Sequence, residues 1–374
     1  MCNFSDYRLL AKLQRLISKL PYDRRLLLRS LHICNQYPIY NNSNGSSKHD
    51  VMIELMERAD GDQKARYLGL GMCKSAWACP RCAPLRIEEY RQRITAIINH
   101  WYERGYAAYM VTFTIPHYID QTATEVFTNL RNIYKTFTLN HLPHWKKASG
   151  WIGTIDTNEV KYSRHYGWHF HKHVLFFVPE SYGDTFTSAE FEQNWRAKWI
   201  NLYTPLLRHT EGSAQNVGLY ISKTRIINGD YIAKEMAKTC SSHSTKKRKH
   251  SADVFDLLVS DDPRDNDLYL EFCEAIHRRS RIHIGRNLSK GVDFDIKKNT
   301  PNENPIISTA VVATFTFDEW RSIIRDERET GIEHRVNILQ AAIEDYFNGV
   351  FFYCHQHALP FPHEPDGYVT YIYA

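Results

Sequence analysis

The chain has 374 residues, of which 43% are hydrophobic and 24% charged, as in ordinary soluble globular proteins. No apolar run is long enough to span a bilayer, and the first residues lack a secretory pattern, so we expect a cytoplasmic protein with no membrane partner. A net charge of +5 and 23 tyrosines are compatible with a nucleic-acid partner but do not demonstrate one.

The periodicity of the apolar residues predicts helices and antiparallel strands in mixed order, an α+β fold. Helices are expected over residues 6–31, 83–104, 121–139 and 188–203. Strands are expected over residues 51–56, 66–71, 109–115, 151–159, 168–178, 216–221 and near 310–316, with a polar loop over 40–50. Asn228-Gly229-Asp230 predicts a turn that caps a further helix beginning near Tyr231.

Three cysteines lie close together at Cys73, Cys79 and Cys82, where the last two flank Pro80 and Arg81. A Cys-x2-Cys pair lets two thiolates grip one ion, and tetrahedral zinc needs four ligands. We expect Cys34 to be the fourth ligand, with His32 as the alternative. A closed site of this kind is structural, and the other interpretation is four unrelated buried thiols.

Three histidines alternate in Gly167-Trp-His169-Phe-His171-Lys-His173, directly before an apolar strand. Alternate strand residues share a face, so the three imidazoles should point the same way. We expect His171 and His173 to bind a divalent metal, with His169 as a further candidate. Glu159 on the preceding strand and His117 after the strand near 112 are the other candidates. An open site of this kind suits catalysis, and Mg²⁺ or Mn²⁺ is the expected ion.

Tyr231 and Lys234 lie three residues apart in a predicted helix and therefore share a face. Tyr220 and Lys223 have the same spacing but fall in a predicted strand, where they would face opposite ways. We therefore expect Tyr231 to attack a DNA phosphate, with Lys234 and the metal favouring its phenolate form. The alternative is that Tyr231 only packs against the sheet.

Taken in order, these motifs resemble those of the rolling-circle plasmid replication initiators, which belong to the HUH endonuclease superfamily. The segments that carry the resemblance span about residues 30–290 and are Cys34, Gly71–Cys82, Val111–His117, Gly167–His173, Tyr231–Lys234 and Arg286–Gly291. The resemblance implies a five-stranded antiparallel sheet, His171 and His173 as metal ligands, and Tyr231 as the nicking nucleophile. It also implies a plasmid or phage origin as the DNA partner, with a host helicase and polymerase.

Two departures from the family pattern matter. Lys172 stands between the paired histidines, where a hydrophobic residue is usual. Some relatives place a glutamate shortly before the tyrosine to activate water at termination, and here Ile227-Asn228-Gly229 occupy those positions. Asp230, Glu235 and Tyr220 are the candidates to replace that glutamate.

On this basis we expect three regions: an N-terminal helical and zinc-binding region over residues 1–104, a nuclease core over 105–245, and a mainly helical accessory region over 246–374. The basic run 246–249 marks a boundary, either as a solvated linker or as a DNA contact. The expected function is nicking and rejoining of single-stranded DNA at an origin through a 5′-phosphotyrosine. The alternatives are a transposase or relaxase on the same nuclease, and a zinc-stabilised repressor without cleavage.

Overall fold

The computed structural model describes residues 4–41, 47–48, 50–208, 218–230, 252–292, 294, 306–365 and 371–372. The chain divides into two compact units. The first is built from both ends of the chain, residues 1–75, 79–82 and 300–374, and the second from residues 76–78 and 83–299. In the described part of the chain, no helix has both the length and the apolar character that crossing a bilayer requires.

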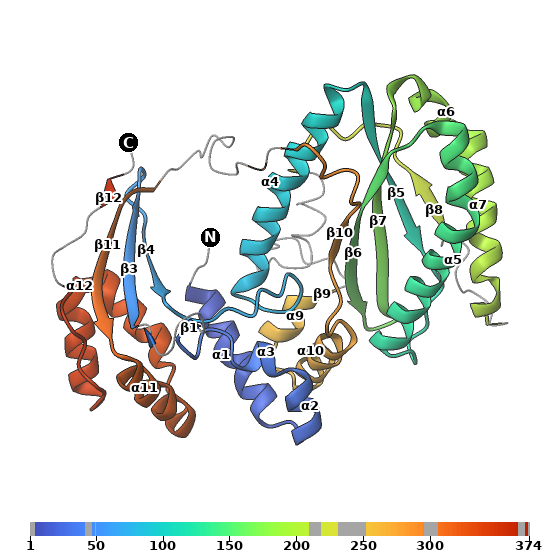
Figure 1. The fold of residues 1–374 in the computed structure, drawn as a ribbon. Helices are drawn as coiled ribbons and strands as arrows, with labels where there is room; N and C mark the ends of the chain where they lie inside the picture. Colours follow the sequence, from blue (N-terminus) through green and yellow to red (C-terminus); the bar gives the residue numbers. More distant parts are fainter. Residues whose placement is uncertain are drawn as a thin grey trace. The chain divides into compact units, whose positions relative to one another are not determined.

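The second unit is organised around an antiparallel sheet with the strand order β10-β6-β7-β5-β8 (Figure 1). Its strands are β5 (Tyr106–Thr114), β6 (Gly153–Ser163), β7 (Gly167–Pro179), β8 (Leu219–Ile221) and β10 (Ile282–Ile284). The short strand β9 (Ala252–Asp253) pairs with the C-terminal end of β6. The predicted α+β fold with a five-stranded antiparallel sheet is therefore confirmed.

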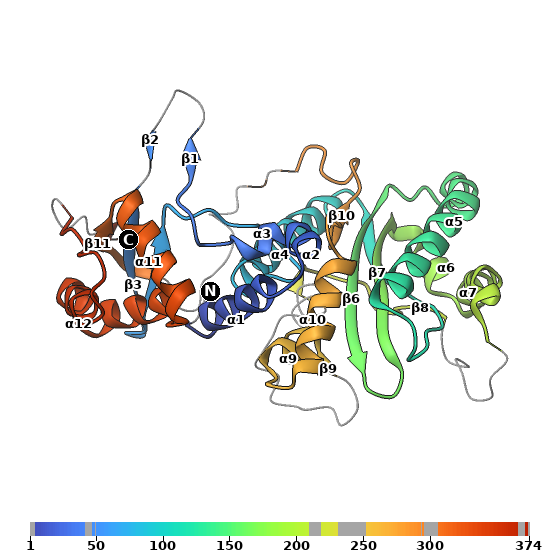
Figure 2. The same ribbon diagram turned by 90° about the horizontal axis from the view of Figure 1, so that it is seen from below.

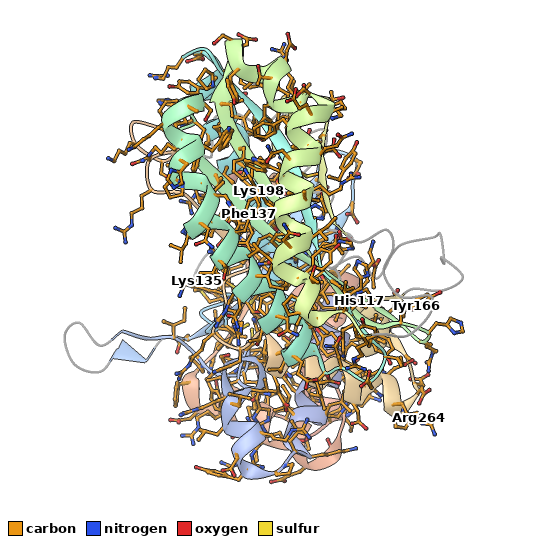
Figure 3. All side chains as sticks on the ribbon, turned by 90° about the vertical axis from the view of Figure 1, so that its right-hand side faces the viewer. His117, Lys135, Phe137, Tyr166, Lys198 and Arg264 are labelled. Atoms are coloured by element: carbon orange, nitrogen blue, oxygen red, sulfur yellow. The ribbon has the colours of Figure 1, made fainter. Side chains whose placement is uncertain are left out.

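Helices cover both faces of this sheet. One face carries α4 (Cys82–Tyr102), and the other carries α5 (Ala123–Ser149), α6 (Gly183–Thr187) and α7 (Ala189–Tyr203) (Figure 1). Figure 3 views the α5 and α7 layer from outside, with Phe137 on α5 and Lys198 on α7 labelled. The remaining elements of this unit are α9 (Val254–Val259), α10 (Pro263–Ala275) and two 3₁₀ turns, Glu180–Tyr182 and Thr204–Leu206. Figure 2 shows α10 beside the β6 edge.

Helix α5 is longer than the predicted helix over 121–139. It begins in a capping box formed by Thr122 and Glu125, and it ends at Gly150 in the left-handed conformation. The helix continues through Pro143 because Leu142 and Trp145 are buried. Tertiary packing therefore outweighs the local helix-breaking signal of the proline.

The two faces of the sheet differ in the side chains they bury. The α5–α7 face holds an aromatic core that includes Phe113, Phe137 and Trp199. On the other face, the isoleucines of α4 pack on one half of the sheet, against Met110, Ile155, Leu175 and Phe177 among others. The other half of that face carries polar side chains, and these form the site described below.

The first unit contains a four-stranded antiparallel sheet of order β12-β11-β3-β4. Its elements are β3 (Val51–Arg58), β4 (Gln63–Leu68), β11 (Ile306–Phe315), β12 (Tyr371–Ile372), α1 (Phe4–Ser18), α2 (Tyr22–Leu27), α3 (Arg29–His32), α11 (Phe317–Thr330) and α12 (His334–Gln356). The ends of the predicted 40–50 loop pair as β1 (Tyr40–Asn41) and β2 (Ser47–Lys48).

Buried polar contacts join the two ends of the chain in this unit. Arg335, at the start of α12, forms an ion pair of 2.6 Å with Glu327. Its guanidinium also donates to the Asn35 carbonyl at 3.0 Å and to Gln14 at 2.7 Å. A buried guanidinium is tolerated because every one of these partners compensates for its lost hydration.

Candidate functional site

The three alternating histidines lie on the polar half of the α4 face, as their spacing predicts. In the strand register His173 is opposite Thr157, His171 is opposite Glu159, and His169 is opposite Lys161. Directly opposite residues in an antiparallel pair project from the same face of the sheet. The hairpin of β6 and β7 therefore gathers imidazoles, a carboxylate and an ammonium group on one surface.

Two threonines of β5 hold the paired histidines from the neighbouring strand. The Thr112 hydroxyl lies 3.0 Å from Nδ1 of His173, and the Thr114 hydroxyl lies 3.0 Å from Nδ1 of His171. A metal-bound histidine commonly hydrogen-bonds through its second ring nitrogen, which fixes the ring and its tautomer. Both contacts use Nδ1, so the arrangement fits two imidazoles that bind an ion through Nε2.

Glu159 is almost fully buried at 4% exposure and sits between His173 and Lys161. Its Oε2 lies 3.0 Å from Nε2 of His173, and its Oε1 lies 2.9 Å from Nζ of Lys161. Burial alone would raise the pKa of Glu159, but His173 and Lys161 together hold that pKa well below its usual range. The carboxylate is therefore charged, as a metal ligand must be.

The last two candidate histidines are linked to each other. Nε2 of His117 lies 3.1 Å from Nδ1 of His169, and Nε2 of His169 lies 3.4 Å from Nδ1 of His171. Burial lowers the pKa of His169 to about 2 and that of His171 to about 3. These imidazoles are consequently neutral near pH 7, which is the form that binds metals.

A buried threonine hydroxyl also lies on this surface. Thr157, opposite His173, is 1% exposed, and its hydroxyl has no hydrogen-bond partner among the described residues. A buried hydroxyl without a partner costs free energy, and such groups often mark the place of a bound ion or water. Imidazoles and a carboxylate are donor types that divalent cations accept. In the described part of the chain, however, only the four cysteines treated below bring their ligand atoms close enough together to hold a metal ion.

Tyr231 and Lys234 lie outside the described residues, as do Glu235 and the basic run 246–249. The described part of this segment ends at Asp230, and Gly229 and Asp230 are both bound to α4. The Gly229 amide donates to the Thr95 hydroxyl at 2.8 Å, and Asp230 forms an ion pair of 2.8 Å with Arg91. The residue before Tyr231 is thus attached to the helix that packs on the histidine-bearing face.

The side chains of Tyr220 and Lys223, the alternative pair with the same spacing, lie on different faces of the sheet. Tyr220 lies in β8, directly opposite Thr112, and therefore projects from the histidine-bearing face. Lys223 instead donates to Glu192 and to the Thr187 carbonyl, both at 2.7 Å. Glu192 belongs to α7, which covers the other face of the sheet. Tyr220 and Lys223 do not form a joint site.

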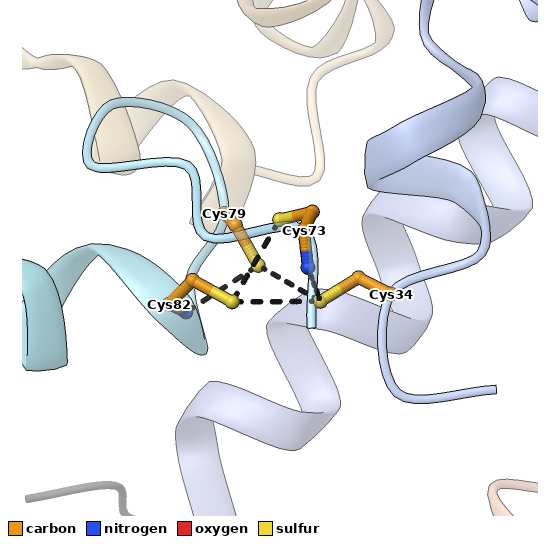
Figure 4. Close-up of side chains that lie close together, drawn as sticks. All are labelled: Cys34, Cys73, Cys79 and Cys82. Carbon is orange, nitrogen blue, oxygen red and sulfur yellow. Dashed lines mark hydrogen bonds between the residues drawn. The ribbon is translucent and has the colours of Figure 1, made fainter. Parts of the chain in front are cut away.

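The four predicted cysteines come together in the first unit (Figure 4). The sulfur of Cys34 lies 3.5 Å from that of Cys82 and 3.6 Å from that of Cys79, and Cys73 lies 3.7 Å from Cys82. Tetrahedral zinc with bonds of about 2.3 Å separates its sulfurs by about 3.8 Å, so the cluster could hold such a metal. Hydrogen bonds from Cys73, Cys79 and Cys82 lower the pKa of Cys34, which favours a thiolate ligand.

Three further polar residues that the sequence analysis did not assign to a site line the histidine-bearing face. Thr112 and Thr114 were visible as an alternating pair in the strand before Pro116, and Lys161 follows Glu159 by two residues on the same strand. Period-two alternation would have placed all three on the histidine-bearing face. Their contacts with individual side chains depend on the register between strands, which a single sequence does not give.

A family model described as "Replication protein" matches residues 66–313, which is more than half of the chain. The curated "Protein rep" of Streptomyces lividans is 28% identical over a stretch that covers 46% of this chain and 49% of the relative. The chain thus spans about half the length of that relative. No solved structure matches the chain. On the extent of the family match, the chain belongs to the replication protein family.

Proposed function

We propose that this protein is a rolling-circle replication initiator, a metal-dependent enzyme that nicks and rejoins single-stranded DNA at an origin. The proposal depends on the cluster of His171, His173 and Glu159 on the polar half of the α4 face. Threonine hydroxyls fix the two histidine rings, and His173 contacts Glu159. Membership of the replication protein family supports the same activity.

His171, His173 and Glu159 are the proposed ligands of Mg²⁺ or Mn²⁺, with His169 and His117 completing the polar cluster. When bound, the ion would draw electron density from a phosphate oxygen and offset the charge that develops during cleavage. Lys161 supplies a fixed positive charge on the same face. Thr112 and Thr114 keep the imidazoles in one orientation before DNA arrives.

Tyr231 is the proposed nucleophile. Its phenol oxygen forms a bond to phosphorus, the bond from phosphorus to the 3′ oxygen breaks, and the product is a 5′-phosphotyrosine with a free 3′-hydroxyl. The phenol loses its proton and the departing oxygen gains one. A phenol with a pKa near 10 needs nearby positive charge to ionise, and Lys234 is the proposed source.

The anchoring of Gly229 and Asp230 on α4 supports this role, because it fixes the start of the Tyr231 segment to the helix that packs on the same face. Asp230 is one candidate for activating water at termination. Its ion pair with Arg91 makes it less available for that task, which leaves Glu235 and Tyr220 as the other candidates.

The proposed partners are plasmid or phage origin DNA in the cytoplasm, a host helicase and a host polymerase that extends the 3′ end. A transposase or relaxase would use the same nuclease chemistry on different DNA. A zinc-stabilised repressor would need the cysteine cluster but would have no use for the histidine-bearing face.

The test is to incubate the protein with Mn²⁺ and labelled single-stranded oligonucleotides and to look for a covalent complex on a denaturing gel. We expect the complex with wild-type protein, and we expect none with His171→Ala, with His173→Ala or in excess chelator. Persistent cleavage in chelator would contradict the metal assignment. No complex with any origin-derived strand, together with tight DNA binding, would favour the repressor.

A further inference from the structure

We propose that the exposed ring of Tyr220 is a stacking platform for an unpaired nucleobase next to the cleaved phosphate. This inference rests on the proposed nuclease function of the same site. It assigns to Tyr220 a role in holding the DNA strand, separate from the chemistry assigned to Tyr231.

The placement of Tyr220 follows from the strand register. Tyr220 of β8 is directly opposite Thr112 of β5, and Thr112 is directly opposite His173 of β7. The three side chains therefore form one row on the histidine-bearing face, and within that row Thr112 and His173 are hydrogen-bonded. Neighbouring strands are about 4.8 Å apart, so the Tyr220 backbone lies about 10 Å from that of His173.

The side chain is exposed while its surroundings are fixed. Tyr220 is 53% exposed, whereas Leu219 and Ile221 on either side are buried on the opposite face. Ser222 donates its amide to the Met110 carbonyl at 2.8 Å, and the Thr114 amide donates to the Gly218 carbonyl at 2.9 Å. The flat ring is thus exposed to solvent on a backbone that strand hydrogen bonds hold in place. Binding a base therefore does not require this backbone to become ordered.

The chemistry of this position favours a nucleobase as its occupant. The ring presents an uncharged π-face, and none of the described residues stacks on it or hydrogen-bonds with its hydroxyl. Every base has a π-face, so aromatic stacking holds a single strand without regard to sequence. Tyr220 lies only two strands from His173, so a strand whose phosphate lies at the metal ligands would bring a base one or two nucleotides away within reach of the Tyr220 ring.

The test compares two substitutions at Tyr220 in a Tyr231→Phe background, in which binding can be measured without cleavage. Single-stranded oligonucleotides carry 2-aminopurine at successive positions, because stacking on a ring quenches its fluorescence. Tyr220→Phe keeps the ring and loses the hydroxyl, whereas Tyr220→Ala loses both. Tyr22→Ala, which removes an even more exposed tyrosine in the other unit, is the matched control.

We expect Tyr220→Ala to weaken binding by about 5- to 150-fold and to abolish quenching at one position, since stacking contributes about 1–3 kcal/mol per base. Tyr220→Phe and Tyr22→Ala should bind and quench like the parent. Unchanged binding in Tyr220→Ala, or equal loss in Tyr220→Phe, would overturn the proposal. So would loss of the covalent complex in Tyr220→Phe with Tyr231 intact, since Tyr220 would then be the nucleophile. A protein that forms no covalent complex but shows the Tyr220 effect would support stacking and contradict the nuclease function.

Discussion

His171 and His173 are each held through Nδ1 by a threonine hydroxyl, and Nε2 of His173 lies 3.0 Å from the Glu159 carboxylate. The alternation of three histidines was enough to predict that they share a face, because strand geometry has a fixed period of two. The sequence could not show that threonines of a third strand fix their rings. Each of these contacts, Thr112 with His173 and Thr114 with His171, joins residues about sixty positions apart in the sequence.

Removing these hydroxyls should weaken metal binding. We expect Thr112→Val and Thr114→Val to raise the dissociation constant for Mn²⁺ by about 10- to 100-fold, because outer hydrogen bonds orient metal-bound histidines. Serine at either position should restore most of the affinity, and Thr154→Val, on the other face of β6, should change nothing. Isothermal titration calorimetry measures the constants, and valine variants that bind like wild type would refute the role of the hydroxyls.

The buried imidazoles should also make stability depend on pH. Burial lowers the pKa of His171 to about 3 and of His169 to about 2, against about 6.5 in an unfolded chain. Between these values the unfolded chain binds protons that the folded protein does not, so stability is full above about pH 6.5 and falls as the pH drops below it.

Urea unfolding of the metal-free protein at about pH 7 and about pH 5 measures this effect. We expect a lower free energy of unfolding at the acidic pH, and a smaller difference in His171→Gln and His169→Gln. An identical pH dependence in wild type and both variants would show that these histidines are not buried in their neutral form.

At the scale of whole elements, the β6–β7 hairpin and helix α4 were both predictable from the sequence, but the contacts that α4 makes were not. Residues 151–159 and 168–178 are both predicted strands, close in sequence and joined by a short polar turn, so their pairing is local. The contact of α4 with the residues before Tyr231 joins Arg91 to Asp230, and no local pattern encodes it. The same holds for the pairing of β3 with β11, which brings the two ends of the chain together.

The anchor on α4 can be tested at Gly229. A Cβ atom there would lie 2.3 Å from the Arg91 carbonyl oxygen and 2.6 Å from the Thr95 hydroxyl, so Gly229→Ala must displace the chain from the helix. We expect the rate of covalent-complex formation to fall on the order of 100-fold, because a displaced reacting group is costly, while Mn²⁺ affinity stays unchanged.

Gly218→Ala is the matched control, since its nearest neighbour would be a flexible arginine carbon at 3.8 Å. Single-turnover measurements of complex formation give both rates. Wild-type speed in Gly229→Ala would show that the anchor does not position the nucleophile.

At the scale of the whole molecule, the cysteine cluster belongs to the unit built from both ends of the chain. Cys34 comes from the N-terminal segment, outside the residues matched by the family model, whereas Cys73, Cys79 and Cys82 lie within them. The tight spacing of those three predicted a metal site, and the structure places Cys34, the expected fourth ligand, together with them. That the cluster holds a metal, and that this metal is zinc, are predictions.

We expect one zinc ion per chain by elemental mass spectrometry. Cys34→Ser and Cys79→Ser should lose the ion and unfold at a lower temperature, because structural zinc contributes directly to folding. Cys354→Ala, a buried cysteine of the same unit outside the cluster, should keep the zinc. Retention of a full zinc equivalent in both serine variants would exclude the cluster as its site.

Mass mapping of the trapped complex tests most directly whether Tyr231 forms a covalent bond with DNA. The protein is cleaved with a protease after reaction with a single-stranded origin oligonucleotide and Mn²⁺, and the DNA-linked peptide is sequenced. We predict a 5′-phosphate on Tyr231, and no adduct in Tyr231→Phe. A nucleotide attached to Tyr220 or to any other residue would contradict the account.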